Sequence, residues 1–154
     1  MLSGTFAAAL VLPTTEFVVF NSTLVTRSAT DGVACTNRHN FGTSATNVPA
    51  LFGGTGTTIF ATGSSGALKH VFCGILSATA GASSLRCDTR VTSFTGTTGA
   101  AAINSLRIGA ACNATQFLSG KFAEYIAIAG AATQAVITEI MDYLGARYAI
   151  TISA

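Results

Sequence analysis

Short runs of β-branched and aromatic residues, separated by clusters of Gly, Ser, Thr and Asn, recur along most of the chain. Runs of this kind between turn signals are typical of β-strands. No helical pattern lies between them, so the order favours an all-β antiparallel sandwich over a parallel α/β sheet. We predict strands at residues 16–20, 59–61, 69–76, 84–91, 105–108 and 121–128.

The pattern changes near the C-terminus, where apolar residues recur at the spacing of a helix. Thr133 is a suitable N-cap, because its hydroxyl can accept a hydrogen bond from an unpaired amide of the first turn. We predict one amphipathic helix of about four turns that packs onto the sandwich. Its apolar positions are Val136, Ile137, Ile140, Met141, Leu144 and Tyr148.

The runs at 69–76 and 84–91 predict a hairpin whose register can be estimated. With the turn at residues 79–82, Cys73 lies nearly opposite Cys87, within cross-strand reach. One face of the second strand is polar, and we expect it to meet solvent or a partner. Its side chains are Arg86, Asp88 and Arg90.

The cysteine spacing shows no metal or redox motif. Cys35, Cys73, Cys87 and Cys112 lack the closely spaced pairs of a structural zinc site, so we predict no metal. Four cysteines permit three disulfide pairings, and reduced cysteines that pack as small apolar residues fit the sequence as well. If a bridge forms, the predicted pair is Cys73–Cys87.

The amino-acid composition indicates a surface with few charged side chains. Only 9% of the 154 residues are charged and 49% are apolar, whereas about 25% of a soluble domain is usually charged. No linker, repeat or charge block divides the chain, so residues 1–154 are predicted to be a single domain. So bland an exterior suggests burial against other proteins, and a homo-oligomer is expected.

Membrane and nucleic-acid partners are not predicted. The most apolar candidate span, residues 125–141, contains polar side chains and is bracketed by Glu124 and Asp142. A secretory signal peptide has Lys or Arg before its apolar stretch, whereas no basic residue precedes the apolar stretch at residues 1–12. Net charge is +2 and the basic residues are scattered, without the clustered footprint that nucleic-acid binding needs.

The sequence contains few candidate catalytic residues, and we predict neither an enzyme nor a cofactor. No two carboxylates have the in-strand spacing of glucanases of sandwich fold. His39 lies near Cys35 without a nucleophile signature, His70 is expected at a strand boundary, and the Gly-rich residues 53–56 read as a turn. The carboxylates are Glu16, Asp31, Asp88, Glu124, Glu139 and Asp142.

Glu124 shares its predicted strand face with Phe122, Ile126 and Ile128. A carboxylate among apolar neighbours needs a partner. We expect a structural ion pair with Arg107 of the preceding strand; a ligand site is the alternative.

The motifs LRIGA at 106–110, FLSGKFAEYIAI at 117–128 and YLGARYAI at 143–150 resemble the concanavalin A-like lectin/glucanase superfamily. The resemblance is closest to the laminin G-like domains of tailed-phage and bacterial surface proteins. LRCDT at 85–89 and FVVF at 17–20 also match, although Thr89 stands where the family has Gly. The resemblance covers roughly residues 17–150 and implies a two-sheet jelly roll.

The resemblance also sets the functional expectation. Members commonly carry strands before the FVVF strand, so we expect an open sheet edge that a neighbouring subunit could cover. The leading hypothesis is a non-enzymatic structural virion protein, a phage capsid decoration or virion-attached protein, assembled in the host cytoplasm. The alternative is a carbohydrate-binding module of a phage tail or fibre, which would recognise host glycan through loops around Thr55 or Thr97.

Overall fold

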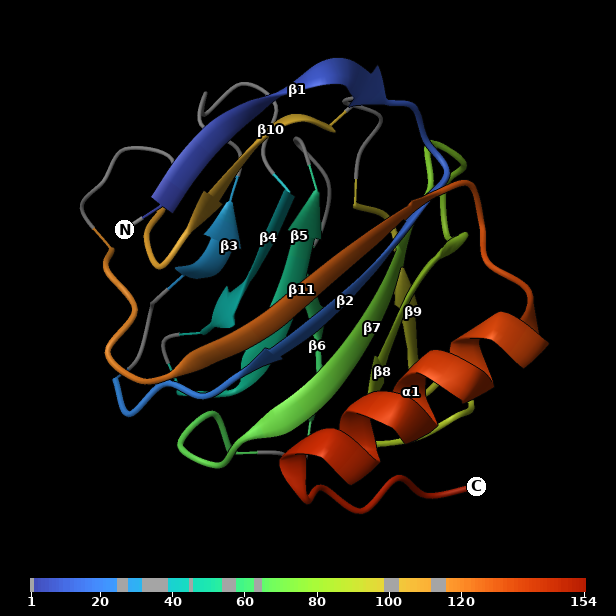
Figure 1. Ribbon diagram of the computed structural model, residues 1–154. Helices are drawn as coiled ribbons and strands as arrows, with labels where there is room; N and C mark the ends of the chain where they lie inside the picture. The colour runs from blue at the N-terminus through green and yellow to red at the C-terminus, as the bar shows by residue number, and fades with distance from the viewer. Residues whose placement is uncertain are drawn as a thin grey trace.

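Two antiparallel sheets face each other, and helix α1 (Gln134–Tyr148) lies on the outer face of one of them (Figure 1). This computed structural model describes residues 2–24, 28–31, 39–44, 46–53, 58–62, 65–98, 103–111 and 116–154. The architecture confirms the predicted all-β, two-sheet antiparallel jelly-roll sandwich with one C-terminal helix.

The six-stranded sheet runs in the order β1-β10-β3-β4-β5-β6 and the five-stranded sheet in the order β11-β2-β7-β8-β9. The strands of the first are β1 (Leu2–Leu10), β10 (Ile103–Ile108), β3 (Ser28–Asp31), β4 (His39–Thr43), β5 (Pro49–Gly53) and β6 (Ile59–Phe60). Those of the second are β11 (Phe122–Ala129), β2 (Thr14–Phe20), β7 (His70–Leu76), β8 (Ser83–Cys87) and β9 (Phe94–Gly96).

All of the predicted strands are present, as β2, β6, β7, β8, β10 and β11. The second strand of the hairpin is shorter than predicted. It ends at Cys87 because Asp88 adopts a left-handed conformation with φ 53°, which breaks the extended backbone. Strands β1, β3, β4, β5 and β9 were not predicted, since their Gly, Ala, Ser and Thr positions give little apolar alternation.

Two apolar layers hold the molecule together. The layer between the sheets is built on residues such as Phe20, Phe41 and Phe72. The second layer lies between the five-stranded sheet and α1, where Phe17 and Val71 meet Met141. Strand β2 contributes to both layers, so all seven of its residues are buried.

Helix α1 begins as the sequence predicts: the hydroxyl of Thr133 accepts a hydrogen bond from the amide of Val136. The polar face of β8 was expected to meet solvent or a partner, and that expectation is wrong. Asp88 bonds to His70 instead, and Arg86 is buried beside helix α1, where it donates to Gln134 over 3.4 Å. Arg90 continues the contact and donates to Asp142 over 2.8 Å.

Candidate functional site

Strand β1 is an edge strand with an unusual surface. It pairs with β10 along one side, from Leu2 opposite Ile108 to Leu10 opposite Ile103. Among the described residues, no other strand pairs with it. Seven of its nine residues are exposed, and none is charged. An uncharged open edge of this length is a template for pairing with another chain.

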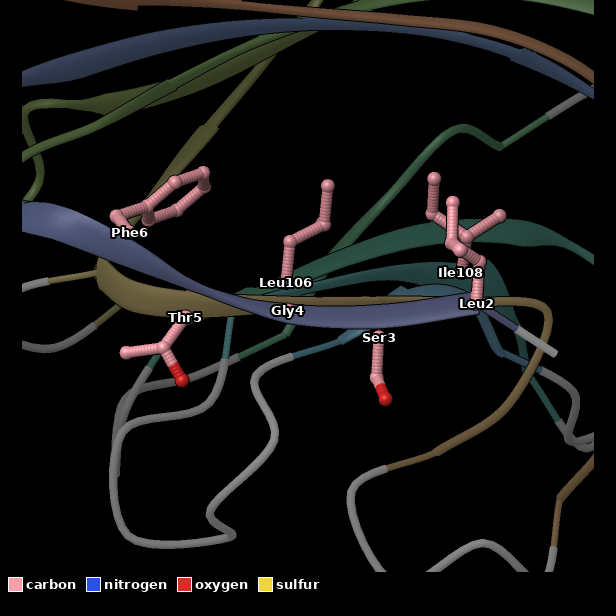
Figure 2. A pocket seen from close by; sticks show the side chains of 7 residues that line it. All are labelled: Leu2, Ser3, Gly4, Thr5, Phe6, Leu106 and Ile108. Carbon is pink, nitrogen blue, oxygen red and sulfur yellow. The ribbon is translucent and has the colours of Figure 1, made fainter.

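A groove lies beside this edge, with a volume of about 270 Å³. Figure 2 shows Leu2, Phe6, Leu106 and Ile108 pointing to one side of the strand pair, toward the five-stranded sheet. Ser3 and Thr5 point to the opposite side (Figure 2). The groove therefore has an apolar lining on the face that a sandwich normally covers.

The two ends of β1 differ in how well they are covered. Phe6 and Leu10 are partly buried and pack against the core between the sheets. Leu2, at the other end, keeps 68% of its surface exposed. With Leu106 and Ile108 it forms a contiguous apolar surface beside an open backbone edge, and contiguous apolar surfaces mark interaction sites.

Several charged side chains of the described residues form ion pairs with other residues of the same chain. Arg90 pairs with Asp142, and Glu124 forms an ion pair with Arg147 at 3.4 Å. None of the residues that line the groove is ionisable. The groove suits an apolar partner better than a charged one.

The predicted ion pair between Glu124 and Arg107 is wrong. Arg107 lies on β10 and Glu124 on β11, in different sheets. Glu124 instead accepts a hydrogen bond from the hydroxyl of Tyr148 at 2.8 Å and forms an ion pair with Arg147. The partners come from α1 because Glu124 lies on the outer face of the sheet. Phe122 packs into the inner core, since the register shifts between Phe122 and Glu124.

The predicted Cys73–Cys87 bridge is also wrong. Cys73 lies opposite Arg86, and Cys87 lies opposite Phe72. The estimated register was off by one residue, and such a shift moves a side chain to the other face of the sheet. The thiol of Cys73 packs in the layer under α1, that of Cys87 against the core between the sheets, and both cysteines are reduced.

One chemical cluster was missed by sequence reasoning. His70 Nδ1 lies 2.5 Å from Asp88 Oδ2, and a side-chain ligand atom of each of His70, Cys87 and Asp88 lies within 4.8 Å of the others. Burial lowers the pKa of His70, but its hydrogen bonds with Asp88 and Cys87 outweigh that effect and raise the pKa to about 10. The signal in the sequence was an aspartate inside the predicted strand at 84–91, because Asp is disfavoured in strands. Its left-handed backbone turns it out of the strand.

A second titratable pair lies between the sheets. Glu16 is fully buried on β2, and burial raises its pKa from 4.5 to about 8, although a hydrogen bond with Tyr125 lowers it. Burial and the neighbouring carboxyl also raise the pKa of Tyr125 well above its usual value. Sequence analysis assigned Glu16 no role beyond a place in the predicted strand at 16–20.

The remaining residues considered as candidates in the sequence lie outside the described residues or make structural contacts. Cys35, Cys112, Thr55 and the side chain of His39 lie outside the described residues. The hydroxyl of Thr97 accepts a hydrogen bond from the amide of Gly81 at 2.9 Å, which ties it to the β7–β8 turn. In the parts of the chain that the structure describes, no helix has the length and hydropathy for a membrane crossing.

Comparison with solved structures supports the fold. The chain is similar to the native heptameric SAP-like pentraxin from Limulus polyphemus, with a TM-score of 0.65 and 11% sequence identity. The similarity covers 90% of this chain and 75% of the pentraxin chain. The likeness in fold confirms the two-sheet jelly-roll sandwich. No family model and no curated protein matches the sequence.

Proposed function

We propose that this chain is a non-enzymatic structural protein of a virus particle, which acts by burying the β1 edge and its groove against another subunit. The finer family assignment, a laminin G-like domain of tailed-phage type, belongs to the same proposal. In this reading the protein decorates the capsid or is otherwise attached to the virion. Assembly takes place in the host cytoplasm.

The observation that carries the proposal is the open, uncharged edge of β1 beside an apolar groove. Burying an exposed leucine such as Leu2 contributes about 1.5–3 kcal/mol. Backbone hydrogen bonds from a paired strand would add direction and register. The low overall charge, 9% of residues, fits a protein whose surface is largely covered.

The partner that this surface fits is a second copy of the chain or another virion protein with an exposed strand. A second copy would meet no like-charge repulsion, because β1 and the groove hold no charged residue. Homo-oligomerisation is therefore part of the proposal.

Sedimentation velocity over a range of protein concentrations tests the interface. The variant Leu2→Lys places a charge in the groove, and Leu68→Lys is the matched control, because Leu68 is likewise exposed, at 64%, but lies outside β1 and does not line the groove. We expect self-association of the wild type, weakened more than about tenfold in L2K and retained in L68K. A wild-type chain that stays monomeric and binds no other virion protein would overturn the proposal.

A separate experiment tests whether the protein is part of the virus particle. Density-gradient purification of particles, followed by mass spectrometry and immunogold labelling, should find this chain on intact virions. Its absence from the particles would reject the virion role, even if the chain dimerises.

A second candidate function, glycan binding by a phage tail or fibre, has a specific observation in its favour. A groove of about 340 Å³ is lined by Ser44, Thr46, Val48, Phe60 and Thr62. Phe60 is 43% exposed beside these hydroxyls, so its apolar ring face and the neighbouring hydroxyls could contact one sugar. Saturable binding on a glycan array that Phe60→Ala abolishes would favour this function over the structural one.

A further inference from the structure

Three donor atoms of different chemistry meet at the end of the β7–β8 hairpin. They are Nδ1 of His70, the thiol sulfur of Cys87 and a carboxylate oxygen of Asp88, all within 4.8 Å of one another. His70 begins β7, Cys87 ends β8, and Asp88 follows directly. The hairpin brings together residues that are 17 and 18 positions apart.

The side chains of His70 and Asp88, which supply the nitrogen and the oxygen donor, are each held in place by a second contact. The other ring nitrogen of His70, Nε2, lies 2.8 Å from the carbonyl oxygen of Ser65. The other oxygen of Asp88, Oδ1, accepts from the amide of Val71 at 2.7 Å. A backbone carbonyl on the far ring nitrogen is how proteins usually orient a metal-binding histidine.

The backbone of Asp88 is fixed in an uncommon conformation. Its φ of 53° is left-handed, which is uncommon outside glycine. The amide of Asp88 donates to Val71 at 3.0 Å, and its carbonyl accepts from the amide of Ser153 at 2.9 Å. Backbone strain that surrounding contacts maintain is characteristic of functional positions.

We propose that His70, Cys87 and Asp88 form a binding site for one divalent transition-metal ion, of which Zn²⁺ fits the donor set best. Imidazole nitrogen, thiolate sulfur and carboxylate oxygen are all zinc ligands, whereas Ca²⁺ and Mg²⁺ prefer oxygen alone. Three protein ligands leave a fourth position for water or for a donor from a neighbouring subunit.

The site is reachable and needs little rearrangement. His70 is 7% exposed, and the side chain of Asp88 is 25% exposed, so an ion can enter from the Asp88 side. Nδ1 and Oδ2 are hydrogen-bonded to each other at 2.5 Å, whereas two ligands of a tetrahedral zinc ion lie about 3.4 Å apart. Rotation of the Asp88 side chain opens that gap. The ring and the thiol release their protons to solvent as the ion binds.

Cobalt(II) titration of the full-length, reduced chain tests the proposal, because a cobalt–thiolate bond gives a charge-transfer absorption band. Cys87→Ser removes the proposed sulfur ligand. Cys73→Ser is the matched control, since that buried cysteine faces helix α1 on the other side of the sheet. Circular dichroism of each variant establishes that it is folded.

We expect one Co²⁺ per chain with a thiolate band, displaced by Zn²⁺, in the wild type and in C73S. C87S should lose the band and bind more than about tenfold more weakly. His70→Gln should weaken binding as well. A thiolate band that persists in C87S would place the metal on another cysteine, and the absence of binding would leave only a structural hydrogen-bond cluster. Either result overturns the proposal.

Discussion

The carboxyl of Glu16 and the hydroxyl of Tyr125 lie together in the layer between the two sheets. Strands β2 and β11 bring them there, because Glu16 pairs with Ala127 and Tyr125 with Val18 in the same antiparallel ladder. Both groups are removed from solvent, and their pKa values are raised. A buried acid of this kind links the stability of the fold to pH.

The free energy of unfolding should therefore fall as the pH rises from 4.5 to 8. The ordinary pKa of a glutamate carboxyl is 4.5, and that of Glu16 in the folded chain is about 8. Between these values the folded state keeps a proton that the unfolded state releases, so this contribution to stability is largest below pH 4.5 and is lost by pH 8. The loss is on the order of a few kcal/mol.

Urea titrations at pH 5 and pH 8 measure this dependence, with Glu16→Gln as the control. The variant keeps the shape of the side chain but cannot ionise, so its stability should change less over the same range. An equal pH dependence in the variant would assign the effect to other groups.

Alkylation should distinguish the two described cysteines. Burial raises the pKa of Cys73 to about 12, although Arg86 opposes the rise, and the residue is fully buried. The thiolate is the reactive form, so Cys73 should resist alkylation in the native chain while the partly buried Cys87 reacts. Peptide mass spectrometry after a timed iodoacetamide treatment gives the two rates. Unfolding in guanidinium should make both react. A Cys73–Cys87 disulfide in the untreated protein would contradict the register.

Adding one methyl group between the sheets should destabilise the sandwich. A β-carbon on Gly74 would lie 2.7 Å from the Phe41 ring and 2.8 Å from Leu51, on the facing sheet. Gly74→Ala should cost about 1–3 kcal/mol, measured by urea unfolding, because the core must shift to admit it. Gly4→Ala is the matched control: its β-carbon meets nothing within 4 Å, and its effect should stay within about 0.5 kcal/mol.

The N-cap of helix α1 can be tested by a conservative pair of variants. Thr133→Ala removes the hydroxyl that accepts from Val136 and should cost about 1 kcal/mol. Thr133→Ser keeps the hydroxyl and should be nearly neutral. Thermal unfolding followed by circular dichroism compares the two, and equal melting temperatures would show that the cap contributes nothing.

The sequence by itself determined the fold class, the main strands of the five-stranded sheet and the capped helix. These follow from local information: the period of apolar residues in β2 and α1, and the hydroxyl of Thr133. Composition alone also indicated a weakly charged exterior. The expectation of an edge left open by missing strands before the FVVF strand is wrong, because β1 precedes that strand and itself forms an edge.

Only the tertiary structure decided which side chains meet. A shift of one residue in the β7–β8 register separated Cys73 from Cys87, and the assignment of β10 and β11 to different sheets separated Arg107 from Glu124. The left-handed turn at Asp88 brought that residue to His70. Cross-strand register and sheet membership depend on the packing of the whole chain, so a local pattern cannot fix them.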